Sequence, residues 1–350
     1  MKDKHSWLDF PVVESKGRIS IIGSLRGYAA LAVLLCHASE LLTDFNLIAH
    51  VFSYGQMGVV MFFVISGVVM PWSLHAMAYK TKDIFRFLAQ RSVRIDVPYY
   101  FIIAITLLYY WIITLRPGFA GNPFHFDWIR TVLHLGYLIP FSTTYTWYNN
   151  AFWTLAIEFQ YYVLLGLSFQ LLQRFKWSQP LMLVLLALIG FWQFSNNDLF
   201  IFRYQGLFVM GIVLYQLFNG LIDLKTGIAV ALLETVLVGF QYHWVAAGTG
   251  LLSFFLVLRF HNYQLPGVFL GKISYSLYLV HPLVISVLFS LFRRLPTGAL
   301  WGITYFCLTI IISVLAAWIL WRFVEVPALN WSHSIKEWFK KNKSISSASH

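Results

Sequence analysis

Apolar runs of about 20 residues recur along the chain and are separated by short polar segments. A helix needs about 20 apolar residues to cross the roughly 30 Å hydrocarbon layer of a membrane. The runs therefore predict an all-α integral membrane protein, a bundle of about ten transmembrane helices. The expected spans are 22–42, 56–79, 95–115, 151–172, 180–195, 200–218, 226–241, 244–260, 273–292 and 299–323.

One segment, 127–141, does not fit this pattern, because it is short and carries Asp127, Arg130 and His134. We predict that it is re-entrant or interfacial. The distribution of basic residues agrees with ten spans when 127–141 is not counted as one, since cytosolic loops are enriched in Lys and Arg. With ten spans, most basic loops fall on the side of both termini, and Arg293 with Arg294 is the clear exception.

The sequence thus predicts a transmembrane domain, 22–327, between a cytosolic amino-terminal segment, 1–21, and a cytosolic tail, 328–350. The composition agrees, with 59% hydrophobic and 11% charged residues, far from the mix of soluble domains. The net charge of +11 comes from short loops. It favours anionic membrane lipids as partners and argues against nucleic acid. Cys36 and Cys307 lie in apolar runs, and no metal site is expected.

The first predicted span carries ionisable side chains, which are costly inside a membrane and usually mark function. Arg26 and His37 are eleven residues apart. A helix places them about 20° apart in azimuth and about 16 Å apart along its axis. Arg26 is expected near the cytosolic end and His37 near mid-membrane, with Glu40 further along the same face. A snorkelling arginine and a structural histidine are the alternative interpretation.

The second and third predicted spans carry further candidates. Gly67 is typical of close helix packing, which leaves Ser66 as a hydroxyl that can face a cavity. Arg91 and Arg94, at i and i+3 of a helix start with Pro98 just inside, can chelate a phosphate or pyrophosphate. The same two arginines can also act only as an anchor at the inner membrane surface.

Glu158, in the fourth predicted span, is expected to approach His37 and to orient its imidazole or raise its basicity. A structural hydrogen bond to an aromatic residue is the alternative. In the ninth span, Ser274, Tyr278 and His281 fall at i, i+4 and i+7. This spacing predicts a wet polar seam along one helix face, loosened by the proline that follows the histidine.

Six segments carry a resemblance when they are taken in order: LRGYAALAVLLCHA, FFVISG, RSVRIDVPYY, WTLAIE, GKISYSLYLVH and RFVEVP. The chain resembles the membrane-bound acyltransferase 3 family, as a stand-alone carbohydrate O-acyltransferase. The resemblance implies transfer of an acyl group, most often acetyl from acetyl-CoA, to hydroxyls of O-antigen or exopolysaccharide. By motif match, Arg26 and His37 take the places of the essential pair. Arg91 and Arg94 take the places of the arginines that handle the donor.

The expected mechanism brings the donor thioester from the cytosolic side to His37. This residue acts as a general base or carries the acyl group transiently, and Glu158 stabilises its imidazolium. No permanently bound cofactor is expected; acyl-CoA is the donor substrate, and a glycan or lipid-linked glycan is the acceptor. The expected donor-binding residues are Arg91, Arg94, Ser66 and Gly67. The expected acceptor contacts are Tyr275, Tyr278, His281 and Glu40.

The expected location is the inner (cytoplasmic) membrane. Three alternatives stay open from the sequence: a polytopic transporter with a His/Glu proton relay, a glycan-binding partner without catalysis, and an acyltransferase for a non-glycan small molecule. A transporter or a binding partner would not cleave acetyl-CoA.

Overall fold

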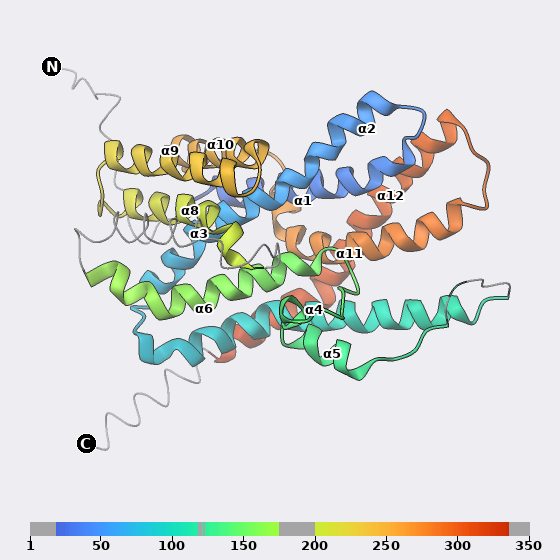
Figure 1. Ribbon diagram of the computed structural model, residues 1–350, viewed down its shortest axis with the longest axis horizontal. Helices are drawn as coiled ribbons and strands as arrows, with labels where there is room; N and C mark the ends of the chain where they lie inside the picture. The colour runs from blue at the N-terminus through green and yellow to red at the C-terminus, as the bar shows by residue number, and fades with distance from the viewer. Residues whose placement is uncertain (1–18, 118–120, 122, 175–199, 336–350) are drawn as a thin grey trace. The chain divides into compact units, whose positions relative to one another are not determined.

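The computed structural model describes residues 19–117, 121, 123–174 and 200–335, and this part of the chain is helical and contains no strand (Figure 1). The α-helices are α1 (Ile21–Ala38), α2 (Asn46–Ser53), α3 (Gly58–Ala76), α4 (Ile84–Thr114), α5 (Trp128–Leu135), α6 (Phe152–Arg174), α8 (Gln205–Phe218), α9 (Leu224–Gln241), α10 (Trp244–Phe260), α11 (Val268–Phe292) and α12 (Ala299–Leu320). The short helices are η1 (Ser39–Leu41), η2 (Tyr54–Met57), η3 (Thr81–Asp83), η4 (Ile139–Phe141), η5 (Ile201–Arg203) and the π-helical turn η6 (Trp321–Glu325).

Among the described residues, seven helical segments are long and apolar enough to cross a membrane, and α8 and α10 are shorter apolar helices. This confirms the predicted all-α membrane bundle. The predicted span 180–195 lies outside the described residues. The segment around α5 does not qualify as a span, because α5 has only 8 residues. Asp127 caps it by accepting a hydrogen bond from the Arg130 amide at 2.9 Å.

Several predicted helix boundaries are wrong in the same way. α4 begins at Ile84 rather than at residue 95, so Arg91 and Arg94 lie well inside the helix and not at its start. α11 begins at Val268 rather than at residue 273. The last span continues through η6 to Ile335 rather than ending at residue 323. The predictions followed apolar runs, whereas backbone hydrogen bonding continues through the amphipathic turns that flank them.

The chain divides into two compact units, which we describe separately. The first comprises residues 1–29, 56–82 and 160–272, and it is built around α3, α8, α9 and α10. α8 is buried along its whole length. A Cβ atom on Gly211 of α8 would lie 2.6 Å from the Cα of Gly67 in α3. The backbones of α3 and α8 therefore touch, as small residues allow in membrane helices.

The second unit comprises residues 30–55, 83–159 and 273–350. Its α11 and α12 meet where the rings of Phe292 and Tyr305 stack at 4.2 Å. The Ser276 hydroxyl donates to the Glu325 carboxylate in η6 at 2.6 Å. The Tyr275 hydroxyl donates to the carbonyl of Ile95 in α4 at 2.7 Å. These contacts fix α11 against α4 and α12, and α11 carries several of the candidate side chains.

Candidate functional site

A cavity of about 410 Å³ lies within the second unit, a size typical of small-molecule sites. Four parts of the unit form its wall: the end of α1 with η1, the carboxyl-terminal part of α4, the loop before α6, and α11 around its proline. Its lining residues are His37, Glu40, Thr106, Tyr109, Tyr110, Trp147, Tyr148, Asn149, Asn150, Pro282, Leu283, Ile285, Ser286 and Phe289.

His37 lies in the last turn of α1, because the helix ends at Ala38 and tightens into η1. The residue is therefore nearer the end of this helical segment than its middle, and its predicted mid-membrane depth stays a prediction. Its ring stacks on that of His281, with centroids 5.3 Å apart and planes at 29°. Two histidines that the sequence placed in different roles thus form one pair.

His281 is completely buried, at 0% exposure. Its Nδ1 atom lies 3.1 Å from the carbonyl oxygen of Leu277. A carbonyl only accepts hydrogen bonds, so Nδ1 carries the proton and Nε2 of the neutral ring carries a lone pair. Nε2 is buried and has no hydrogen-bond partner among the described residues. Leaving a buried polar atom without a partner costs about 1–3 kcal/mol, so this atom in a native fold calls for an explanation.

Glu40 is the carboxylate that acts electrostatically on His37. Glu158 acts electrostatically on Tyr278, and it is not among the residues that line this cavity. The Tyr278 hydroxyl lies 2.8 Å from that of Thr154 in α6. The predicted role of Glu158 towards His37 stays a prediction, whereas Glu40 lines the same cavity as His37.

The polar row of α11 exists but is not a wet seam. Ser274 and His281 have 0% exposure and Tyr278 has 7%, so the helix packs this face against protein. The hydroxyl of Tyr275 is already used by the Ile95 carbonyl, and its predicted contact with the acceptor stays a prediction.

The other predicted residues are distributed over both units. Arg91 and Arg94 are half-buried residues of α4 in the second unit. Arg26 of α1 and Ser66 and Gly67 of α3 belong to the first unit. Gly67 has a clear packing role against α8, and its predicted role in donor binding stays a prediction.

The loop before α6 was not predicted to be part of a site, but it supplies Trp147, Tyr148, Asn149 and Asn150 to the cavity. Its signal in the sequence is the polar and aromatic stretch TTYTWYNN just before a span. Glu234 of α9 in the first unit was not predicted either; it has 0% exposure and no partner for either carboxylate oxygen among the described residues.

His134 of α5 holds this loop in place. Its Nδ1 lies 2.8 Å from the Arg130 carbonyl, and its Nε2 accepts the amide hydrogen of Tyr148 at 2.9 Å. Burial lowers the pKa of His134 from 6.5 to about 4; the charge of Arg130 acts in the same direction, whereas the hydrogen bond to its carbonyl opposes the shift. Because the folded pKa is below the unfolded one, the unfolded chain binds the proton first. The stability that the neutral ring contributes is complete above about pH 6.5 and is lost as the pH falls towards 4.

A comparison with protein families finds the acyltransferase 3 family, described as an acyltransferase domain, over residues 19–322. No curated protein and no solved structure gives a significant match. The family match covers most of the 350 residues. The chain therefore belongs to the acyltransferase 3 family and is a multi-pass membrane acyltransferase, which sets the transporter and the non-catalytic interpretations aside.

Proposed function

We propose that this member of the acyltransferase 3 family transfers an acetyl group from acetyl-CoA to a hydroxyl of a surface or exported glycan. The observation that carries the proposal is the His37–His281 pair, with rings 5.3 Å apart at the wall of a cavity that also contains Glu40. The cavity offers a base, a carboxylate and several hydroxyl and amide groups. Such groups suit an uncharged polar acceptor that must lose a proton.

His37 is the general base in this proposal. Its ring takes the proton of the acceptor hydroxyl while the oxygen attacks the thioester carbonyl. The tetrahedral intermediate then collapses, the carbon–sulfur bond breaks, and the thiolate of CoA leaves and takes the proton back from the imidazolium. Glu40 stabilises that transient positive charge.

His281 keeps the pair at a single positive charge. Two charged rings 5.3 Å apart would repel each other by about 3 kcal/mol at an effective dielectric constant of about 20. The burial of His281 adds a cost for its charged form. The proton therefore stays with the more accessible His37, where it can return to the leaving group.

Donor binding is assigned to Arg91 and Arg94 of α4, whose guanidinium groups suit the phosphates of CoA. The protein is placed in the inner membrane with both termini in the cytosol, which gives the donor access from the side where acetyl-CoA is made. A reporter fused after Lys343 should read as cytosolic, and an external reading would contradict this topology.

The activity is tested with detergent-purified protein, acetyl-CoA and oligosaccharides released by mild acid from the surface polysaccharide of the cells that carry the protein. We expect acceptor-dependent release of CoA thiol and a glycan product heavier by one acetyl group in mass spectrometry. Acetyl transfer to small non-glycan alcohols, with none to any oligosaccharide, would instead support the small-molecule alternative. Absence of any cleavage of acetyl-CoA would contradict the proposed donor.

A further inference from the structure

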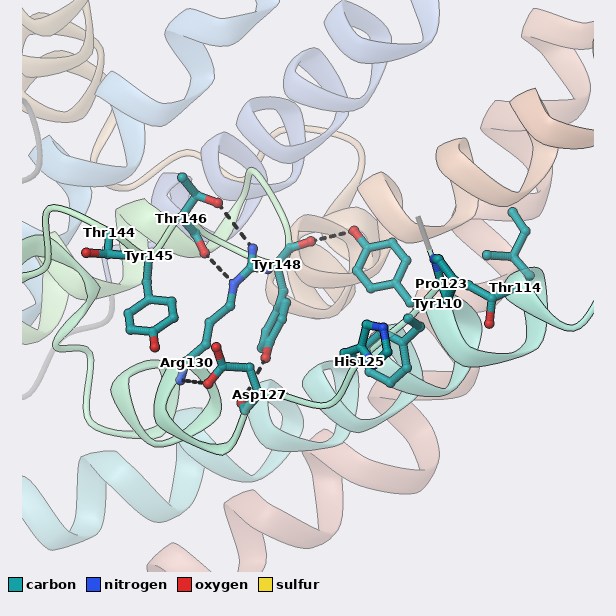
Figure 2. Close-up of a pocket in the computed structure, with 12 residues that line it drawn as sticks. Tyr110, Thr114, Pro123, His125, Asp127, Arg130, Thr144, Tyr145, Thr146 and Tyr148 are labelled. Carbon is teal, nitrogen blue, oxygen red and sulfur yellow. Dashed lines mark hydrogen bonds between the residues drawn. The ribbon is translucent and has the colours of Figure 1, made fainter. Parts of the chain in front are cut away.

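A second cavity, of about 520 Å³, lies in the same unit and is bounded by the end of α4, the segment that leads into α5, and the loop 144–148 (Figure 2). It is lined by Tyr110, Ile113, Thr114, Pro123, Phe124, His125, Asp127, Arg130, Thr144, Tyr145, Thr146 and Tyr148. Aromatic rings alternate in this wall with hydroxyls, a carboxylate and a guanidinium group. None of these residues was among the candidates from the sequence patterns.

Arg130 is held rigidly in this wall. Its Nε donates to the Thr146 carbonyl at 2.9 Å, and its Nη2 donates to the Thr146 hydroxyl at 3.2 Å (Figure 2). The same Nη2 also donates to the Trp147 carbonyl at 3.1 Å. Its guanidinium carbon lies 4.2 Å from the centroid of the Tyr148 ring. Nη1 keeps its two N–H donors, because no hydrogen bond within the described residues uses them. The site therefore presents fixed donors at little cost in conformational entropy.

The charges of the wall favour an uncharged ligand over an anion. Asp127, which caps α5, and Arg130 in its first turn both line the cavity. The carboxylate offsets the guanidinium charge and would repel a phosphate or a second carboxylate, by about 4 kcal/mol at contact distance near a protein surface. Paired donors and acceptors beside aromatic rings suit a polyol, whose hydroxyls donate and accept and whose C–H face can lie on a ring.

The two cavities share a wall. Tyr110 and Tyr148 line both of them, and the Tyr110 hydroxyl donates to the Tyr148 carbonyl at 2.8 Å. The two cavities are therefore neighbours, and a molecule that extends over Tyr110 and Tyr148 would have one end on the side of His37 and the other on the side of Arg130. The second cavity is thus positioned to hold a neighbouring part of the molecule that reacts in the first.

We propose that the second cavity is a carbohydrate subsite that binds the sugar residue next to the one acetylated at His37. This inference rests on the proposed function, because it assigns part of the glycan acceptor to Asp127, Arg130 and Tyr145. It makes the enzyme prefer an acceptor of at least two sugar residues over a monosaccharide.

Two substitutions test the subsite while the backbone hydrogen bonds around it are kept. Tyr145→Ala removes a ring from the cavity and keeps the backbone hydrogen bond that Tyr145 makes to Ser142. Asp127→Asn removes the charge and keeps the helix cap, since Asn is as good a capping residue as Asp. Phe126→Ala is the matched control, an exposed aromatic in the same segment that does not line the cavity.

The measurements are the acceptor KM for the oligosaccharide mixture, the acetyl-CoA KM, and acetyl-CoA hydrolysis without acceptor. We expect each of the two variants to raise the acceptor KM roughly 10-fold, the loss of about one charge-assisted or stacking interaction. The donor KM and the hydrolysis rate should stay unchanged. The Phe126→Ala control should match the wild type in all three measurements.

Transfer by the wild type with an unchanged acceptor KM in both variants would overturn the subsite and leave the proposed function intact. If inorganic phosphate competes with the acceptor and Arg130→Gln relieves the competition, the cavity is an anion site. That result would also overturn the carbohydrate subsite. Failure of the wild type to transfer acetyl to any oligosaccharide would overturn the proposed function and the subsite together.

Discussion

Replacing His37 by glutamine removes the proposed general base while retaining a polar side chain of similar length. Glutamine cannot take up a proton from the acceptor hydroxyl. The cavity keeps most of its shape, because His37 contributes one half-buried side chain to a wall drawn from four parts of the unit. We expect kcat for transfer to fall by roughly 10² to 10⁴, the usual contribution of a positioned base.

The structure separates this loss from a loss of stability. The substitution removes one ring contact, the stack on His281 at 5.3 Å, which is worth about 0.5–1.5 kcal/mol. The catalytic loss corresponds to about 3–5 kcal/mol in the activation free energy. A slightly lower melting temperature therefore cannot account for an inactive enzyme.

The assay is transfer from acetyl-CoA by detergent-purified protein at saturating donor and acceptor, with melting curves recorded on the same samples. His50→Gln is the matched control, because His50 is exposed at the end of α2 and does not line the cavity. It should retain full activity. If His37→Gln keeps more than about a tenth of wild-type turnover, short of the loss expected for a base, the role given to His37 is wrong.

Three further outcomes are expected. Arg91→Ala combined with Arg94→Ala should raise the acetyl-CoA KM at least roughly 10-fold with little change in the acceptor KM; the reverse pattern would reassign the pair. Stability should fall by about 3 kcal/mol as the pH drops from 6.5 to 4, because the unfolded chain protonates His134 first; melting curves of His134→Gln should lack this component. Gly211→Ala should destabilise the first unit by about 1–3 kcal/mol. Gly248→Ala is the control and should not, because nothing lies within 4 Å of the added carbon. Equal melting temperatures of the two variants would contradict the close packing of α3 and α8.

The sequence alone determined the fold class and the family. Long apolar runs have few alternatives to a membrane helix, because every backbone polar group must be satisfied within the segment. The same logic separated α5 from the spans, since its charged residues and short length do not suit the hydrocarbon layer. Helix ends were less well determined, as α4 shows by starting at Ile84 in an amphipathic stretch.

The partners of the candidate residues were decided by the tertiary structure. His37 and His281 were each visible as polar residues in apolar helices, but nothing in the local pattern indicated that their rings would stack. Spacing along one helix fixes which residues share its face, whereas contacts between helices depend on how the helices pack. For the same reason, the local pattern did not indicate that Glu40 would line one cavity with His37 and act on it electrostatically.

The loop before α6 shows the limit of sequence patterns most clearly. It has no helical or strand periodicity, so the sequence did not predict which way its side chains would point. Its conformation is set by distant groups, through the amide of Tyr148 on His134 and the carbonyl oxygens of Thr146 and Trp147 on Arg130. Backbone polar groups that become buried, such as those of Tyr148, must be satisfied by whatever partners the fold supplies. Both cavities take their shape from this loop, and only the folded chain could reveal them.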